Sequence, residues 1–405
     1  MTGAPARDIR DMTVHLVRDL DELEALGPEW DALHALDPQA GAFLRWGWLM
    51  RGFRDAGHRA TVLAVRAEDQ GGSLIGLLPL KSRVHWSRSR KEYQTQYQPA
   101  GRLLGRTQAG FLCAPGWEVD VIAACAETLS QIPWTELSLG RLGQGGRGKR
   151  FRSCFDKAVY SVSYISARSS GGEGQPTIAA DLSLPDSYQA FLDNHPSARV
   201  RDDLLSIEKR FLETGKVQLV DTSTDRFNAH LAILLSMWSE AELARRGKAP
   251  SSRAKDGLQR LLSEANDAGV LFMPMLVEDG QPLGVLAHLV DRDLGRVHAV
   301  QGGLAPSEVP VQTILHMASI EWAIAHGFGL YDFGQVEAAD VERFGASERK
   351  LRSLSIRRRV PARGEALDSA NAAEALTRVL GHIRAGRQDQ AVTGCEQVIA
   401  ALSAD

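Results

Sequence analysis

Alternating apolar and polar positions in the second half of the chain predict three neighbouring strands. The alternation is interrupted by Asp279-Gly280, a dipeptide typical of a two-residue hairpin turn. The strands are expected at Leu271–Glu278, Leu283–Val290 and Arg296–Gln301. Because a two-residue turn joins antiparallel neighbours, the first two strands are predicted to pair as a hairpin.

A helix and one more strand are predicted to follow. Apolar residues recur at helical spacing through "VQTILHMASIEWAIAHG", starting at Val311, and Gly327 is a typical helix stop. The segment "FGLYDFG" then predicts a short strand that ends on Gly334. The second half therefore has the predicted order β-β-β-α-β.

The first half of the chain has a similar pattern. The segment "TVLAVRAEDQGGSLIGLLPL" predicts two strands around a Gly turn, "EVDVIAACAETLSQ" predicts a helix, and "TELSLG" predicts a closing strand. These parallels indicate a duplicated α/β unit. The Gly/Ser-rich stretch at residues 166–176 is typical of an exposed linker between the two halves.

Helices are also predicted outside the two sheets. Residues 197–214 and 226–246 are expected to be helical, and residues 372–402 to form a helical hairpin around Gly386 that resembles a tetratricopeptide unit. A single such hairpin cannot bury its own apolar face, so it must pack on its own chain, on a dimer mate or on a protein partner. The predicted domains are residues 1–165, 177–360 and 361–405.

Composition narrows the class of protein. The 405 residues are 44% apolar and 24% charged with a formal net charge of −3, which is typical of a globular protein and gives no general attraction to nucleic acid or anionic membrane. We find no apolar run long enough to span a bilayer or to serve as an export signal, so a cytoplasmic protein is expected. The four cysteines lack paired spacing, so we expect reduced core thiols, no disulfide framework and no metal site.

An ordered set of segments resembles a known family. The segments are "EWDALHALDPQAGAFLRWGWLMRGF", "GSLIGLLPL", "SYQAFLDNHPSARVRDDLLSIEKRFLETGKV", "GQPLGVLAHL" and "AIAHGFGLYDFG". Together they resemble the GNAT-like acyltransferases of the CelD/FemAB-like group from about Thr13 to Arg359. The resemblance implies an α/β fold of two tandem GNAT-like domains and transfer of an acyl group to an amine or hydroxyl. Simple GNAT enzymes use acyl-CoA as the donor, and peptidoglycan-bridge members use aminoacyl-tRNA.

Two segments depart from the family pattern. "APSEVPVQ" lacks the Gly that usually precedes the last long helix, and residues 336–341 lack a Tyr-Lys pair that is common after the closing strand. These departures favour one alternative function, a non-catalytic scaffold that binds a protein through the C-terminal hairpin. A second alternative is an aminoacyl-tRNA-dependent transferase.

The start of the predicted helix at Val311 is the candidate donor site. Unpaired N–H groups and the helix dipole favour an anion such as the phosphates of CoA or of a carrier-bound thioester. Glu308 and Pro310 act against such a site, the first by its charge and the second because it removes an N–H group. The candidate donor-binding residues are Gln301, Gly302, Gly303, Ser307, Gln312 and Thr313.

Three residues are candidates for the chemistry, because acyl transfer to an amine needs a proton acceptor beside the nucleophile. Glu337 is the first candidate because it follows the end of the closing strand, where α/β folds often place ligand-contacting loops. Asp332 is the second, and if buried it must find a partner. His298 is the third, with His288 as a weaker histidine alternative.

Regular alternation predicts which residues share a face of the sheet. It places Val297, Ala299 and Gln301 on one face of their strand and His298 with Val300 on the other. The predicted function is an N-acyltransferase that uses a small-molecule or carrier thioester, with an amine acceptor in the cleft between the domains. An amino sugar or polysaccharide precursor is suggested as acceptor by the family resemblance alone.

Overall fold

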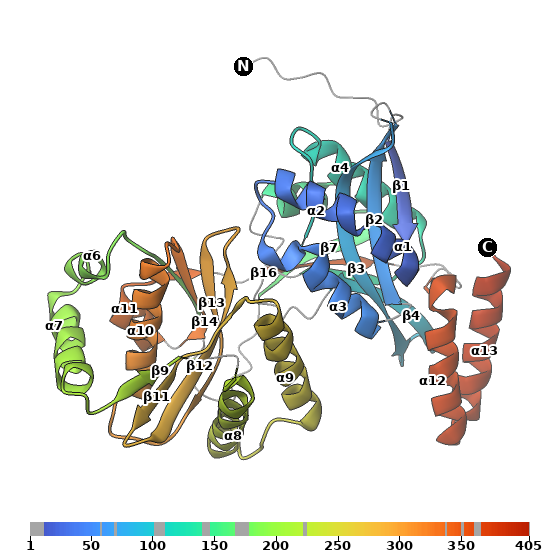
Figure 1. The fold of residues 1–405 in the computed structure, drawn as a ribbon. Coiled ribbons are helices and arrows are strands. Elements are labelled where there is room, and N and C mark those ends of the chain that lie inside the picture. The colour runs from blue at the N-terminus through green and yellow to red at the C-terminus, as the bar shows by residue number, and fades with distance from the viewer. Residues whose placement is uncertain are drawn as a thin grey trace. The chain divides into compact units, whose positions relative to one another are not determined.

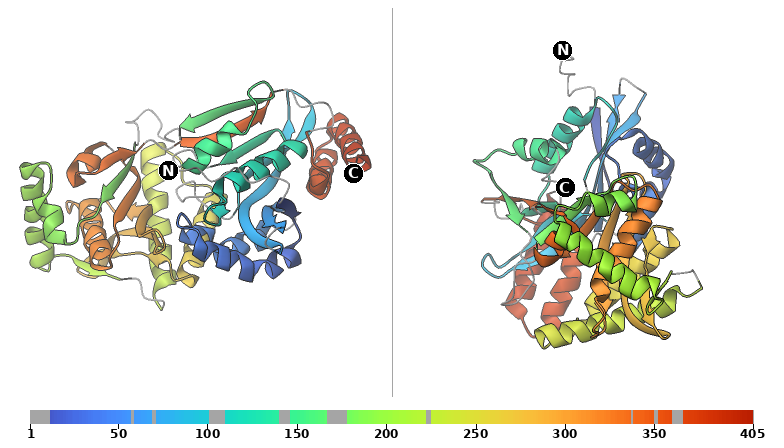
Figure 2. Two further views of the ribbon diagram at one scale, coloured as in Figure 1. Left: turned by 90° about the horizontal axis from the view of Figure 1, so that it is seen from above. Right: turned by 90° about the vertical axis from the view of Figure 1, so that its left-hand side faces the viewer.

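The computed structural model describes residues 12–56, 59–68, 71–100, 110–139, 146–166, 178–221, 225–336, 338–349, 352–359 and 366–404. The chain divides into two compact units (Figure 1). Unit 1 consists of Met1–Ala167 with Arg352–Asp405, and unit 2 consists of Arg168–Leu351. Each unit has its own mixed sheet, its own covering helices and its own apolar core (Figure 2). The predicted α/β fold of two units in tandem, each a mixed sheet flanked by helices, is confirmed.

The sheet of unit 1 is built mainly from the N-terminal part of the chain. Its strands in spatial order are β1 (Met12–Val17), β2 (Ala60–Ala67), β3 (Ser73–Ser87), β4 (Glu92–Pro99), β6 (Glu136–Leu139), β16 (Arg352–Arg358) and β7 (Tyr160–Ser166), with β5 (Leu112–Cys113) beside β3. The helices are α1 (Leu20–Ala25), α2 (Gly27–Leu36), α3 (Trp46–Ala56), α4 (Glu118–Gln131) and α5 (Gly146–Ser153). Cys113 and Cys125 are buried as expected of core thiols, whereas Cys154 is exposed.

The sheet of unit 2 has the same plan. Its strands in spatial order are β15 (Ser347–Arg349), β8 (Ile178–Ser183), β14 (Leu330–Val336), β13 (Arg296–Leu304), β12 (Gln281–Asp291), β11 (Met275–Glu278) and β9 (Gln218–Val220), with β10 (Leu271–Phe272) beside β12. The helices are α6 (Tyr188–Asp193), α7 (Ala198–Ile207), α8 (Phe227–Arg246), α9 (Ser252–Asp267), α10 (Val311–Ala325) and α11 (Ala338–Phe344), and a π-helical segment, Glu208–Glu213, continues α7.

The predicted elements of unit 2 are present with small changes. Asp279 and Gly280 both have positive φ, 50° and 76°, as a two-residue hairpin turn requires. The predicted strand at Leu271–Glu278 is divided into β10 and β11 around Pro274, which has no N–H to donate to a neighbouring strand. Helix α10 begins at Val311 as predicted.

Two glycines show that the units follow one design. A Cβ at Gly76 in β3 would collide with Val121 in α4, and a Cβ at Gly284 in β12 would lie 2.6 Å from Cγ1 of Val311 in α10. In each unit, the second strand of the main hairpin therefore needs a glycine so that the following helix can lie close to the sheet.

One strand of the first sheet comes from beyond unit 2 along the chain. Strand β8 begins unit 2 and pairs antiparallel with β14 and β15 of the same unit. Strand β16 follows β15 of unit 2 but pairs antiparallel with β6 and β7 of unit 1. The predicted domain at 177–360 is therefore wrong at its end, because residues 352–358 belong to the first sheet. The predicted linker at 166–176 lies almost entirely outside the described residues.

The C-terminal hairpin packs on unit 1. Its helices are α12 (Ala372–Arg384) and α13 (Gln388–Ser403). The side chain of Gln397 accepts a hydrogen bond from the N–H of Tyr93 at 2.6 Å and donates one to its carbonyl oxygen at 2.7 Å. The inner face of the hairpin joins Val84, Tyr93 and Leu367 in a small apolar cluster. The hairpin is therefore part of unit 1, not the separate domain predicted at 361–405.

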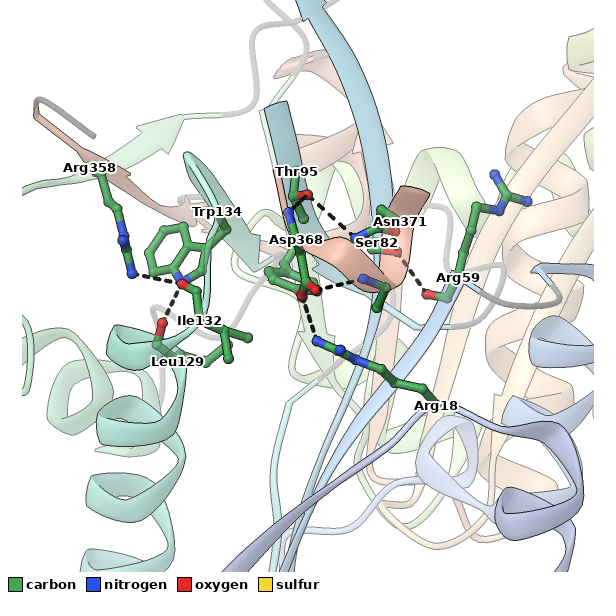
Figure 3. A network of polar contacts seen from close by, with 12 residues as sticks. Arg18, Arg59, Ser82, Thr95, Leu129, Ile132, Trp134, Arg358, Asp368 and Asn371 are labelled. Carbon is green, nitrogen blue, oxygen red and sulfur yellow. Dashed lines mark hydrogen bonds and ion pairs between the residues drawn. The ribbon is translucent and has the colours of Figure 1, made fainter. Parts of the chain in front are cut away.

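A buried polar network fixes the segment that leads into the hairpin (Figure 3). Asp368 accepts hydrogen bonds from Arg18 at 2.6 Å and from the hydroxyl of Tyr97 at 2.7 Å, and its own N–H donates to the hydroxyl of Thr95 at 2.9 Å. Asn371 continues the network to Ser82. Because these partners come from the N-terminal strand region, β3 and β4, the C-terminal segment holds unit 1 together. Among the described helices, none is long and apolar enough to cross a bilayer.

Candidate active site

The candidate site lies where the parallel strands β13 and β14 of unit 2 separate (Figure 1). Their parallel pairing starts at Arg296 with Leu330 and ends at His298 with Asp332. Both strands continue beyond this register, β13 to Leu304 and β14 to Val336. In α/β sheets, ligands bind beside the carboxyl ends of neighbouring parallel strands, so this register is the expected place for chemistry.

His298 and Asp332 are hydrogen-bonded at this last shared register. His298 Nδ1 lies 2.9 Å from Asp332 Oδ2, and the N–H of Gly334 donates to Asp332 Oδ1 at 2.8 Å. A carboxylate only accepts hydrogen bonds, so in the neutral imidazole Nδ1 carries the proton and Nε2 carries the acceptor lone pair. The prediction that Asp332 needs a partner if buried is confirmed, because its exposed fraction is 0%.

Two further polar residues extend this pair into a row across the sheet. The strand register places Asp181 of β8 directly beside Asp332, and Ser347 of β15 directly beside Asp181. Residues that face each other in register share one face of a sheet. His298, Asp332, Asp181 and Ser347 therefore form a polar row with two carboxylates next to one imidazole. We refer to these four residues as the polar row.

Sequence analysis did not identify Asp181 or Ser347. Each lies in a short strand with no motif, and β8 is distant in sequence from β13 and β14. Their place in the row follows only from the insertion of β8 between β14 and β15. The only available signal was an aspartate after three apolar residues in the segment "IAADLS".

A β-bulge changes the predicted position of Gln301. The register shifts between Ala287 and His288, so that Gln301 lies opposite Ala287 while His298 lies opposite Leu289. Ala287 and Leu289 are two residues apart on β12 and share a face, so Gln301 shares the face of His298. Regular alternation was therefore wrong here, because the bulge adds one residue to β13. The side chain of Gln301 donates to the carbonyl oxygen of Gly302 at 2.9 Å.

The two predicted donor-site glycines lie inside a strand that extends beyond its predicted end at Gln301. Gly302 and Gly303 belong to β13. A Cβ at Gly303 would lie 2.8 Å from the carbonyl oxygen of Leu234 and 2.9 Å from Cβ of Met237, so this glycine permits the close approach of α8. A Cβ at Gly302 would meet its nearest neighbour, Leu286, at 3.5 Å. The chain therefore needs glycine at 303 for packing, and this requirement does not apply to 302.

The start of α10 retains free N–H groups. Val311 N–H donates to the carbonyl oxygen of Val309, and Ile314 N–H donates to that of Pro310. Within the described residues, the N–H groups of Gln312 and Thr313 have no hydrogen-bond partner, and the first turn of α10 contains no acidic residue. These groups and the helix dipole suit an anion.

Near this helix start, one side chain shapes the preceding loop and two carboxylates would repel an anion. Ser307 accepts a hydrogen bond from the N–H of Val309 at 3.0 Å and so shapes the loop before the helix. The exposed side chain of Gln312 donates to Asp340 Oδ2 at 3.0 Å, which brings a carboxylate of α11 to the side chain of this residue. Glu308 is exposed. An anion at this helix start would therefore have to avoid both carboxylates.

In unit 1, the corresponding helix start is that of α4, and it carries acidic residues and a nearby ion pair. The first turn of α4 contains Glu118 and Asp120. Arg147 holds Asp37 through two hydrogen bonds of 2.7 Å and also donates to Glu118 at 2.9 Å. Burial lowers the pKa of Arg147, but its bonds to Asp37 and Glu118 raise that pKa above the ordinary value. A buried ion pair and two acidic residues leave this helix start unsuited to an anion.

At the corresponding register, the described part of unit 1 has no histidine–aspartate pair. The last parallel register of β4 and β6 joins Tyr97 and Leu137. The hydroxyl of Tyr97 donates to Asp368, so this position serves the C-terminal network. The features that suit acyl transfer are therefore found in unit 2.

His288 belongs to a different, fully buried chain of hydrogen bonds. Its Nδ1 lies 3.2 Å from the carbonyl oxygen of Phe272, and its Nε2 lies 2.7 Å from the hydroxyl of Tyr331. The same hydroxyl lies 2.9 Å from His316 Nδ1. Burial and the nearby His316 lower the pKa of His288 to about 3, and burial lowers that of His316 to about 3. Both side chains are therefore neutral core residues, and His288 is not placed to act as a base.

Glu337, the first candidate base, lies outside the described residues. Among the residues that the structure describes, no group of three or more metal-ligating side chains is found. Of the three catalytic candidates, the structure therefore joins the second and third, Asp332 and His298, and brings Asp181 beside them.

Comparisons with known proteins agree with this assignment of unit 2. Residues 198–344 match the family model described as the acetyltransferase (GNAT) domain, which extends from α7 to α11. No curated protein matches the chain in sequence.

Several solved structures align with the chain at low sequence identity. A crystal structure of FemX aligns with a TM-score of 0.56 at 9% identity and covers 81% of this chain and 95% of that chain. L-PGS from Bacillus licheniformis has a TM-score of 0.46 at 12% identity, with 85% and 94% coverage. A tandem GNAT protein from the clavulanic acid biosynthesis pathway has a TM-score of 0.43 at 12% identity, with 87% and 99% coverage. Residues 198–344 of unit 2 are thus similar to the acetyltransferase (GNAT) domain, and the chain shares the fold of the FemX structure.

Proposed function

We propose that unit 2 transfers an acyl group from a thioester of CoA or of a carrier protein to an amine. The observation that supports this proposal most strongly is the hydrogen bond between His298 and Asp332 at the register where β13 and β14 separate. A base held by a carboxylate at the carboxyl ends of two parallel strands suits a reaction that must remove a proton from the nucleophile.

The reaction needs one proton acceptor and no covalent intermediate. The amine nitrogen attacks the thioester carbonyl carbon, the new C–N bond forms, the C–S bond breaks, and the thiolate leaves and takes up a proton. His298 Nε2 accepts the amine proton, and Asp332 stabilises the imidazolium that results. Asp332 also keeps the proton of the neutral imidazole on Nδ1, so that the acceptor lone pair is directed away from the carboxylate. Glu337 remains a second proposed base.

The carboxylates of the polar row support an amine acceptor over a hydroxyl acceptor. Asp181 and Asp332 lie side by side on adjacent strands and attract a cation such as a protonated amine. His298 lies at the end of this pair and can receive the proton that the amine must lose. Amino sugars and surface-polysaccharide precursors are the acceptors to test first, on the family resemblance alone.

The start of α10 is the proposed site for the phosphates of the donor. The unpartnered N–H groups of Gln312 and Thr313 support it, as does the absence of acidic residues from the first turn of α10. Gln301, Gly302, Gly303 and Ser307 precede this helix and remain proposed neighbours of the donor. The acidic start of α4 in unit 1 supports a single donor site in the chain.

Two measurements test the proposal. Thermal denaturation of the full chain is followed with acetyl-CoA, longer acyl-CoA thioesters, CoA or acyl carrier protein, and a concentration-dependent rise in Tm supports a donor site. Release of free thiol is then measured with a panel of amino sugars and other amines. The absence of both responses would overturn the proposal. Binding of aminoacyl-tRNA that weakens steeply with salt would support the aminoacyl-tRNA alternative instead.

A further inference from the structure

The outer side of the C-terminal hairpin carries half of the exposed large apolar residues found among the described residues. Twelve large apolar side chains are exposed in the described ranges, and six of them belong to α12 and α13. They are Leu376 (42%), Leu380 (52%) and Ile383 (55%) on α12, and Val392 (56%), Ile399 (64%) and Leu402 (56%) on α13. We refer to these six residues as the outer stripe.

The outer stripe is separate from the face that packs on unit 1. On α12, the stripe residues are spaced by four and three positions and so share one side of the helix, whereas the buried residues Ala375 and Val379 face the body. On α13, the buried residues Gly394 and Val398 likewise face inward. The two helices are antiparallel neighbours (Figure 1), and on each of them the exposed row is distinct from the buried row.

The size of the stripe is at the upper limit for a monomer. Six large side chains that each remain about half exposed amount to an apolar patch on the order of 600 Å², whereas monomers rarely expose more than a few hundred Å² together. Self-association through the stripe would remove about twice this area from solvent, which is in the lower part of the range of specific interfaces.

The charges beside the stripe are complementary between the two helices. On α12, Arg378 forms an ion pair with Glu374 at 2.9 Å. The helix has no second acidic residue, so the positive charge of Arg384 is its excess charge. Helix α13 contains Asp389 and Glu396 and no basic residue. Arg384 and Asp389 are both exposed and lie on opposite sides of the turn at Gly386. A second copy that places its α13 against α12 would therefore set a basic helix against an acidic one.

We propose that the outer stripe is the interface of a homodimer. A two-fold axis parallel to the helices places α12 of each copy against α13 of the other and keeps the two hairpin turns at the same level. The four helices then form an antiparallel bundle, with Leu380 of one copy near Val392 of the other and Arg384 near Asp389 of the other. Such an isologous contact buries the same surface twice.

Sedimentation velocity of the full chain over a concentration series tests this proposal. The natural sequence is expected to sediment as a dimer. Leu380→Glu should weaken the dimer by at least about tenfold in Kd, because the buried charge is introduced twice at one interface. Leu243→Glu is the matched control: Leu243 on α8 is 52% exposed, as Leu380 is, and this variant should remain dimeric.

A charge exchange tests the orientation of the two copies. Arg384→Glu and Asp389→Lys should each weaken the dimer, and the double variant should restore it, while near-UV circular dichroism and Tm show that all variants are folded. The proposal is overturned if the natural sequence is monomeric throughout, or if Leu380→Glu leaves the dimer unchanged. Restored dimerisation in the double variant supports the parallel axis, and its failure after both single variants weaken the dimer overturns that axis.

Discussion

Gly394 of α13 lies directly against the ring of Tyr93 in β4. A Cβ at position 394 would stand 2.6 Å from Cε2 of Tyr93 and 2.8 Å from Cγ2 of Val379, so the hairpin can dock on unit 1 only with glycine at this position. The neighbouring bonds of Gln397 to both backbone groups of Tyr93 fix the same contact. The position of the hairpin on the sheet therefore depends on the smallest possible side chain.

Gly394→Ala should destabilise unit 1. Overpacking of a close contact typically costs about 1–3 kcal/mol, and this exceeds the helix-propensity gain of about 1 kcal/mol from replacing glycine with alanine. Gly381→Ala in α12 is the matched control, because a Cβ there meets nothing within 4 Å, and it should stabilise the chain. Urea denaturation of both variants measures the two free energies, and an equal gain from both would contradict the tight contact.

Substitution of His298 should reduce catalysis more than binding. His298→Asn is expected to lower kcat by about 10²–10⁴-fold with a small change in KM for the donor, since it removes a proton acceptor and not a donor contact. Asp332→Asn should have a smaller effect of the same kind, and the double variant should be little worse than His298→Asn because the two residues act as a unit. His326→Asn, at an exposed histidine of α10's end, is the control that should retain activity. Full activity of His298→Asn would contradict His298 as the base and would favour Glu337 instead.

The two glycines of β13 should respond differently to alanine. Gly303→Ala should lower the free energy of unfolding by about 1–3 kcal/mol, because its Cβ would collide with the backbone of α8. Gly302→Ala should change stability by less than about 0.5 kcal/mol, since its nearest neighbour is at ordinary contact distance. Chemical denaturation separates these outcomes. A weaker affinity of Gly302→Ala for acyl-CoA at unchanged stability would support a donor contact at this glycine.

Acid should destabilise unit 2 through its buried histidines. The folded pKa of His288 and of His316 is lowered to about 3 from the ordinary value of 6.5. Between these values the unfolded chain binds more protons than the folded chain, so the free energy of unfolding falls as pH decreases from about 6.5 toward 3. The loss is at most about 1.4 kcal/mol per pH unit for each histidine.

Denaturation curves at a series of pH values measure this dependence. Above pH 6.5 the two histidines should contribute no slope, because they are neutral in both states. His316→Asn and His288→Gln should each reduce the slope in the acidic range even if they lower the overall stability. An unchanged slope in both variants would show that other groups control the acid sensitivity.

Local sequence signals predicted the elements of unit 2 well because each one rests on short-range physics. The turn at Asp279-Gly280 and the helix from Val311 are determined by backbone preferences of adjacent residues. The division of the predicted strand Leu271–Glu278 also has a local cause, because Pro274 lacks the N–H group that a strand residue donates. The hydrogen bond between His298 and Asp332 was predicted in part: both residues were candidates for the chemistry, and Asp332 was expected to need a partner if buried.

Long-range features were not accessible in this way. The bulge that moves Gln301 to the face of His298 depends on the register between two strands, and this register has no local sequence marker. Asp181 joins the polar row only because β8 is inserted between two strands that lie far along the chain. The same applies to β16, whose sequence continues the second half while its partners belong to the first.

Because β16 lies beyond unit 2 in the sequence, unit 1 depends on a strand that a truncated or partly synthesised chain lacks. A fragment that ends after β7 would leave that strand without β16, the neighbour that joins it to the sheet, and would expose an open edge on β6. On the ribosome, the first sheet must wait until residue 358 has been made, so unit 2 can finish folding before unit 1 does. The part of the chain translated first is thus the part completed last.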